Sequence, residues 1–137
     1  MYNTRQHVLE LLGIVAVVTI IGTGVAGGAR SLALRTRDAQ RAGDVARIQQ
    51  ALALIAAETG SYPMAEALTC IAGDDAISRT LLDRGHLKAS VADPTAPHVP
   101  MADPSPRHCY TYQSRDGSSY TLWYFTEADG ATKTVDP

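Results

Sequence analysis

The prediction of the fold starts from residues 11–29, LLGIVAVVTIIGTGVAGGA. This stretch contains no charged side chain, and it is flanked by Arg5, His7 and Glu10 on one side and by Arg30 on the other. As a helix, about 19 residues are long enough to cross a bilayer core of roughly 30 Å. We therefore predict a membrane-spanning assembly helix.

Two other interpretations of this stretch remain open. A cleaved secretory signal would use Arg5 as its basic end, but the apolar run is long for a signal and Glu10 stands at its start. Residues 22–27 read GTGVAG and match the glycine pattern of dinucleotide-binding folds. That fold needs an acidic residue at the end of a second strand, whereas Asp44 lies in a polar segment with helical periodicity.

Glu10 and four glycines are the candidate assembly residues of the apolar segment. A carboxylate at the edge of a membrane span costs a few kcal/mol unless it is paired, which predicts a functional role for Glu10. The alternative is that Glu10 only reaches the lipid headgroups. Gly22, Gly24, Gly27 and Gly28 would permit close helix approach or mark a place where the helix unwinds. The sequence does not separate these two roles.

The pattern beyond Arg30 becomes amphipathic. Apolar residues recur at spacings of three and four, which predicts one buried stripe made of Ala42, Val45, Ile48, Leu52 and Ile55. Gly60 and Pro63 supply the end of the helix. We predict one helix over residues 8–59, about 80 Å long, with a hydrophobic half and an amphipathic half.

Charged side chains of this second half are expected on the other faces of the helix. They are Arg37, Arg41, Asp44 and Arg47. Asp38 with Arg41, and Asp44 with Arg47, have the i,i+3 spacing of helical ion pairs.

The remainder of the chain predicts a small antiparallel sheet. Residues 108–114 and 119–126 are strand-like and flank Asp116-Gly117, the strongest short hairpin signal. A last strand is expected over residues 132–135, a short helix over 75–82, and a proline-rich loop over 89–107. The stretch that follows Gly60 is expected to be irregular. The fold class is therefore α+β, with residues 1–29 as the hydrophobic helix and residues 30–137 as the globular part.

Two cysteines lie far apart in the globular part. Cys70 is expected in the connector and Cys109 at the start of a strand, so a bond between them would tie the connector to the sheet. Such a bond forms in an oxidising compartment, which fits export of this part. Two buried free thiols are the alternative.

Composition and motifs exclude several classes of function. The net charge of -2 and the pI of about 6.0 give no basic field for nucleic acid. The four histidines are scattered, and neither metal-binding nor nucleophile motifs are present, so we expect no enzyme and no required cofactor. Asp93 and Asp103 are weak candidates for calcium ligands, although Asp-Pro pairs ordinarily form turns.

Three stretches resemble type IV pilins and the pseudopilins of type II secretion. They are Glu10-Leu11-Leu12 with the apolar run, RTRDAQRAGDVARIQQALALIAAETGSYP (residues 35–63), and CYTYQSRDGSSYTLWYF (residues 109–125). The resemblance implies the pilin fold, in which a long N-terminal helix packs on a small sheet. It also implies a subunit that polymerises with copies of itself.

The resemblance assigns a role to Glu10, whose carboxylate would pair with the N-terminal amine of a neighbouring subunit. It implies storage in the cytoplasmic membrane, contact with the inner-membrane assembly machinery, and then an extracellular filament. Such filaments serve adhesion, motility, DNA uptake or secretion. This chain departs from the family at Gln6 and Arg5, where the family has phenylalanine and glycine. The resemblance therefore does not fix the mature N-terminus or its methylation.

Overall fold

One long helix, a short helix and four strands make up the chain. The computed structural model describes the backbone of residues 4–96 and 104–137, and it describes side chains from residue 28 onward within these ranges. The order of elements is α1 (Thr4–Thr59), β1 (Ala65–Ile71), α2 (Ala76–Asp83), β2 (Tyr110–Ser114), β3 (Thr121–Thr126) and β4 (Ala131–Val135). The α+β class is thereby confirmed, and so is a single helix over the predicted residues 8–59.

The chain divides into two compact units, Met1–Arg35 and Thr36–Pro137. We call the second unit the head. Among the described residues, no helix is both long and apolar enough to cross a membrane. Nearly all of the predicted span, residues 11–29, lies outside the residues whose side chains are described.

The four strands form one antiparallel sheet in the order β1-β2-β3-β4. Each strand pairs with its neighbour in the sequence, so the sheet is a meander. The Asp116-Gly117 turn predicted the central hairpin of this meander. Gly117 has a φ of 76°, a conformation that glycine adopts without strain. The carbonyl of Gly117 also accepts a hydrogen bond of 2.8 Å from the backbone N–H of Tyr62, which ties the turn to the chain just after α1.

The prediction of an irregular connector after Gly60 was wrong for residues 65–71. This segment is strand β1, and Cys70 lies in it opposite Thr111 of β2. The sequence AEALTCI contains few strand-forming residues, so its pattern does not predict a strand. Pairing with β2, together with a covalent link to Cys109, determines the conformation of this segment.

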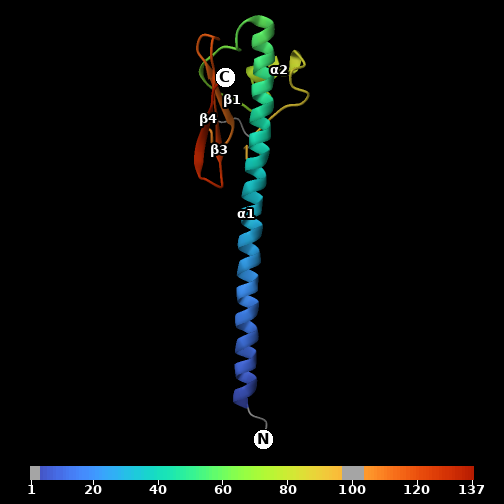
Figure 1. Ribbon diagram of the computed structural model, residues 1–137, viewed down its shortest axis with the longest axis vertical. Helices are drawn as coiled ribbons and strands as arrows, with labels where there is room; N and C mark the ends of the chain where they lie inside the picture. Colours follow the sequence, from blue (N-terminus) through green and yellow to red (C-terminus); the bar gives the residue numbers. More distant parts are fainter. Residues whose placement is uncertain (1–3, 97–103) are drawn as a thin grey trace. The chain divides into compact units, whose positions relative to one another are not determined.

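The core of the head lies between the second half of α1, the sheet and α2. In Figure 1 the strands run beside this half of α1. Buried residues of α1 (Val45, Ile48, Ala51, Leu52 and Ile55) form one cluster with Ile77 and Leu81 of α2 and with Tyr110, Tyr112 and Leu122 of the sheet. The predicted stripe is thus confirmed except for Ala42, which is exposed.

Helix α2 begins one residue later than predicted. Asp75 is its N-cap, and one carboxylate oxygen accepts a hydrogen bond of 2.9 Å from the backbone N–H of Ser78. The other oxygen accepts from the N–H groups of Ala72 and Gly73. A capping aspartate satisfies helix N–H groups that otherwise lack partners. Asp75 therefore fixes the entry of the chain into α2 directly after β1.

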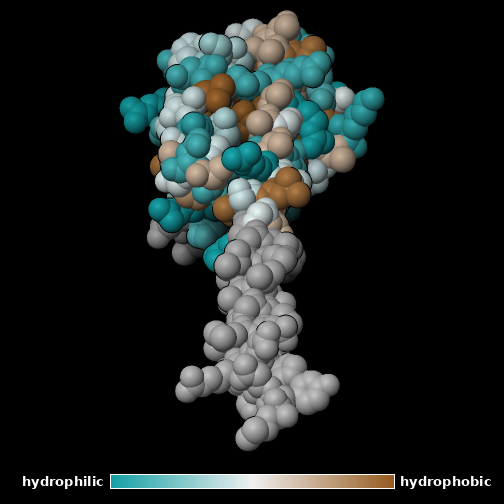
Figure 2. Space-filling model, turned by 60° about the horizontal axis from the view of Figure 1, so that its bottom comes forward, coloured by the Kyte–Doolittle hydropathy of each residue, from teal (hydrophilic) through white to brown (hydrophobic). Residues whose placement is uncertain are grey.

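Large apolar side chains are mostly inside the head. Figure 2 shows one face on which hydrophilic and hydrophobic residues are mixed without a single dominating apolar area. Among the described residues, the large apolar side chains with high exposure are Leu32, Leu54, Met64 and Leu68.

Candidate functional site: a buried ion cluster and a disulfide

Arg41 is the most unusual residue of the head, because its charged side chain is fully buried. Its Nε donates to Asp93 Oδ2 at 2.7 Å, and its Nη2 lies 3.2 Å from Asp93 Oδ1. Its Nη1 lies 2.8 Å from Asp38 Oδ1 and 2.7 Å from Glu127 Oε1. A buried guanidinium is tolerated only when its donors are used and its charge is balanced. Arg41 therefore requires partners from three separate parts of the chain.

Asp38 and Glu127 connect α1 to the turn between β3 and β4. The backbone N–H groups of Glu127 and Ala128 each donate to the Asp38 carboxylate at 2.8 Å. The side chain of Arg37 donates two hydrogen bonds to Glu127, at 2.7 and 2.6 Å. Such paired geometry is the strong form of an arginine–carboxylate contact.

The pKa values of these carboxylates respond to the arginines. The hydrogen bond from Arg37 lowers the pKa of Glu127 to about 2, and Arg41 acts in the same direction against burial. Burial raises the pKa of Asp38, but the N–H groups of Ala128 and Glu127 together with Arg41 outweigh burial and leave this pKa below its usual value. Both carboxylates are therefore ionised at neutral pH.

Asp44, about one helical turn beyond Arg41 in α1, is a second buried carboxylate. Asp44 accepts a hydrogen bond of 2.8 Å from the hydroxyl of Tyr110, which lies in β2. Asp44 also forms an ion pair with Arg47, as the spacing predicted. Burial, followed by the hydrogen bond to Asp44, raises the pKa of Tyr110, so the hydroxyl remains a donor.

We call Arg37, Asp38, Arg41, Asp93 and Glu127 the ion cluster. The expectation that Arg41 and Asp44 decorate other faces of the helix was wrong, because both are buried. The partners that bury them, Asp93 for Arg41 and Tyr110 for Asp44, lie 52 and 66 residues away, beyond any local pattern. The sequence contained one sign of this burial. Arg41 and Asp44 continue the three- and four-residue spacing of Val45, Ile48 and Leu52 toward the N-terminus, so they lie on the same face of the helix.

The ion cluster holds segments together and leaves no reactive group free. Among the described residues, every buried side-chain nitrogen and oxygen has a hydrogen-bond partner. The carboxylates accept from guanidinium or backbone N–H groups, so none is aimed at an open space as a base or nucleophile. The arrangement fixes α1 to the β3–β4 turn through Glu127, and to the loop that carries Asp93 and Thr95.

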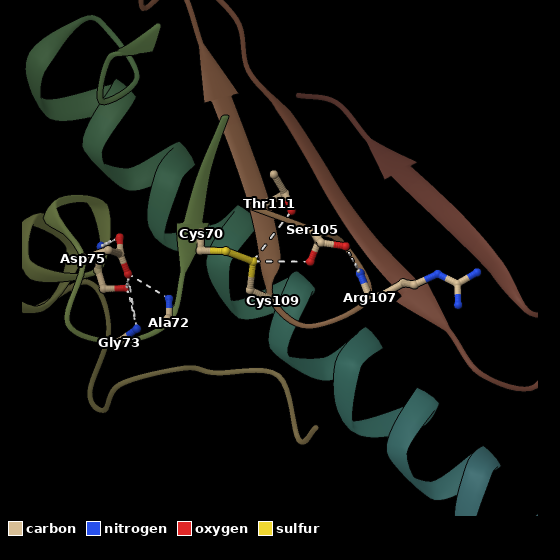
Figure 3. Close-up of a disulfide and its surroundings, with 9 residues drawn as sticks. Cys70, Ala72, Gly73, Asp75, Ser105, Arg107, Cys109 and Thr111 are labelled. Atoms are coloured by element: carbon tan, nitrogen blue, oxygen red, sulfur yellow. Dashed lines mark hydrogen bonds between the residues drawn. A yellow bond between two sulfur atoms is a disulfide. The ribbon is translucent and has the colours of Figure 1, made fainter. Parts of the chain in front are cut away.

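The predicted disulfide is present between Cys70 and Cys109, whose Cα atoms are 5.6 Å apart. It links β1 to the residue just before β2, as Figure 3 shows. Cys109 is buried, and its Sγ lies 3.8 Å from the hydroxyl oxygen of Thr111. The bond closes a loop that contains α2 and Asp93. Because Cys70 lies in strand β1, the bond links a strand to the start of its neighbour. The sequence had predicted a link between an irregular connector and the sheet.

The assembly residues predicted in the apolar segment lie outside the described side chains. This applies to Glu10, Gly22, Gly24 and Gly27. Gly28 is described and exposed, and a Cβ added there would meet nothing within 4 Å. The space around Gly28 within this chain therefore does not require a glycine, and its role in packing or unwinding stays a prediction.

The two calcium candidates are not brought together by anything the structure describes. Asp93 gives both carboxylate oxygens to Arg41, and Oδ1 also accepts from the backbone N–H and hydroxyl of Thr95. Asp103 lies outside the described residues. Within the described ranges, no group of three His, Cys, Asp or Glu side chains is placed to hold a metal ion.

Comparisons with known proteins found no match to a family model, to a curated protein or to a solved structure.

Proposed function

We propose that this chain is a structural subunit of a type IV pilus-like extracellular filament with the pilin fold, and that it polymerises through its N-terminal helix. In this proposal the subunit waits in the cytoplasmic membrane with its head outside. Assembly machinery in that membrane then moves it into a filament made of copies of the same chain.

One observation carries the proposal: α1 is a single helix of 56 residues that begins before the apolar run and whose second half contributes to the core of the head. A helix longer than about 25 residues is uncommon in an ordinary globular domain. The apolar run has a natural environment in lipid and a second one among identical helices, since close packing through small residues can replace lipid contacts.

The head supports the proposal through the way it is fastened to α1. The ion cluster and the disulfide join α1, the loop that contains Asp93 and the sheet into one unit. A subunit that is pulled through its helix needs such fastening, because force on α1 reaches the rest of the head through the ion cluster and through the packing of the core. The disulfide also fits a head that folds in an oxidising compartment.

Two alternatives use the same features. A pseudopilin of type II secretion would share the helix and the sheet, and calcium bound near Asp93 would favour it. A membrane-anchored extracellular binding domain would need only an apolar anchor, so it would tolerate any apolar residue in place of Glu10.

The test is the filament yield of a Glu10→Ala variant, measured by electron microscopy of material sheared from cells that make the full chain. We expect the filaments to be lost while the protein remains in the membrane. Glu66→Ala is the matched control, because Glu66 is exposed on β1 and its substitution removes one negative charge from the head, as Glu10→Ala does from the helix. An unchanged filament yield in Glu10→Ala would remove Glu10 from assembly and favour the anchored binding domain.

A further inference from the structure

Four arginines occur in the twelve residues that follow the apolar run, and the structure divides them into two kinds. Arg37 and Arg41 form ion pairs with carboxylates of the head. Arg30 and Arg35 are exposed, and the structure pairs neither of them with a carboxylate of the described residues. The positive charge of this part of α1 is therefore concentrated on Arg30 and Arg35.

The environment of residues 28–35 is nearly uniform around the helix. Every residue of this segment is exposed except Leu34, which is intermediate. Arg30 and Arg35 are separated by about 140° around the helix axis at 100° per residue. Leu32, with an exposed fraction of 67%, is about 60° from Arg35. A single protein partner would cover one face, whereas this segment offers charge on widely separated faces and an apolar side chain beside Arg35.

We infer that residues 28–35 form a binding site for the phosphate groups of anionic phospholipids. This inference rests on the membrane-stored form of the proposed function, in which the apolar run ends at residue 29. The rise from residue 29 to residue 35 is about 9 Å, which is enough to cross one headgroup layer of roughly 5–8 Å. Arg30 then lies near the boundary with the acyl chains, while Leu32 and Arg35 lie further into the headgroup layer. The stem of Arg35 extends past Leu32, and both guanidinium groups contact phosphate.

The expected preference follows from the two guanidinium groups, those of Arg30 and Arg35, that have no carboxylate partner among the described residues. A basic side chain next to an anionic membrane surface favours binding by about fivefold, so two of them favour it by about twenty- to thirtyfold at low salt. The preference should fall as salt rises, because exposed charges are screened within about 10 Å at 0.1 M ionic strength.

The experiment uses the full chain reconstituted in nanodiscs of phosphatidylcholine with a minor fraction of phosphatidylglycerol. Native mass spectrometry measures which lipids stay bound to the released protein, at 50 and 500 mM salt. We expect wild-type protein to retain phosphatidylglycerol in excess of its share, and Arg30→Gln/Arg35→Gln to lose at least tenfold of that excess. Lys88→Gln/Arg115→Gln is the matched control, since both residues are exposed on the head.

Three results would overturn the inference. They are an equal retention of both lipids by wild-type protein, an unchanged preference in Arg30→Gln/Arg35→Gln, and displacement of the bound lipid by millimolar inorganic phosphate alone. A chain that does not enter the nanodisc would overturn the membrane-stored form and this inference together. A chain that enters without lipid preference would overturn only this inference.

Discussion

Replacement of Arg41 by methionine tests whether the ion cluster holds α1 to the rest of the head. Methionine keeps much of the length of the side chain but removes the guanidinium. Asp93 then remains in a site where its side chain has an exposed fraction of 0%. Removing one partner of a buried ion pair costs about 3–5 kcal/mol, because the other charge stays buried without compensation.

The contacts that remain place the expected cost near the lower end of this range. Asp93 keeps the backbone N–H and the hydroxyl of Thr95, at 2.8 and 2.7 Å. Glu127 keeps Arg37, and Asp38 keeps two backbone N–H groups. We therefore expect the free energy of unfolding to fall by about 3 kcal/mol, a large part of the 5–15 kcal/mol typical of a domain.

The assay is equilibrium urea unfolding of the full chain in mild non-ionic detergent, followed by the fluorescence of Trp123 in β3. Arg47→Met is the control, because the Arg47 side chain has an exposed fraction of 58% and its partner Asp44 keeps the hydrogen bond from Tyr110, so we expect a much smaller loss. The double variant Arg41→Met/Asp93→Leu should regain most of the loss, since an apolar pair can replace a buried ion pair. If Arg41→Met costs no more than Arg47→Met, or if the double variant is no more stable than Arg41→Met, the reasoning about buried charge is refuted.

Three further predictions concern the covalent link, the buried tyrosine and pH. Loss of the disulfide in Cys70→Ser/Cys109→Ser should lower the free energy of unfolding by about 4 kcal/mol, because the bond closes a loop with a sequence separation of 39. Urea unfolding of the oxidised and variant chains measures this, and equal midpoints would show that the bond adds nothing. Tyr110→Phe should lower the free energy of unfolding by about 1–3 kcal/mol, since Asp44 loses a buried hydrogen-bond donor. Thermal unfolding measures this loss, and it should be much smaller for the control Tyr124→Phe, whose ring is only half-buried. Stability should fall as pH drops from about 4.5 toward 2, because Glu127 has a lower pKa folded than unfolded and takes up a proton on unfolding. Glu127→Gln should flatten this part of the pH profile, and an unchanged slope would assign it to other carboxylates.

Elements with local signals could be predicted from the sequence. Gly60, which has a φ of 79°, directly follows the last residue of α1, and its position in the sequence predicted the end of this helix. Asp75 marks the start of α2, and Asp116-Gly117 marks the central hairpin. Each of these residues acts on its immediate neighbours, so its effect can be read without knowing the fold.

Features that depend on distant partners could not be predicted. Strand β1 forms because β2 and Cys109 are beside it, although its own residues favour strands weakly. The burial of Arg41 depends on Asp93 and Glu127, which are distant in sequence. Arg41 and Asp44 extend the apolar stripe of α1. This is the one local sign in the sequence that the buried face of α1 continues beyond its apolar residues.

Assembly of this chain depends on what surrounds the apolar run, residues 11–29, once detergent is removed. Cryo-electron microscopy of the purified full chain after detergent removal measures this. We predict ordered fibres in which this segment of each subunit contacts the same segment of neighbouring copies. Dispersed particles of single chains, or fibres in which residues 11–29 touch no other copy, would contradict it.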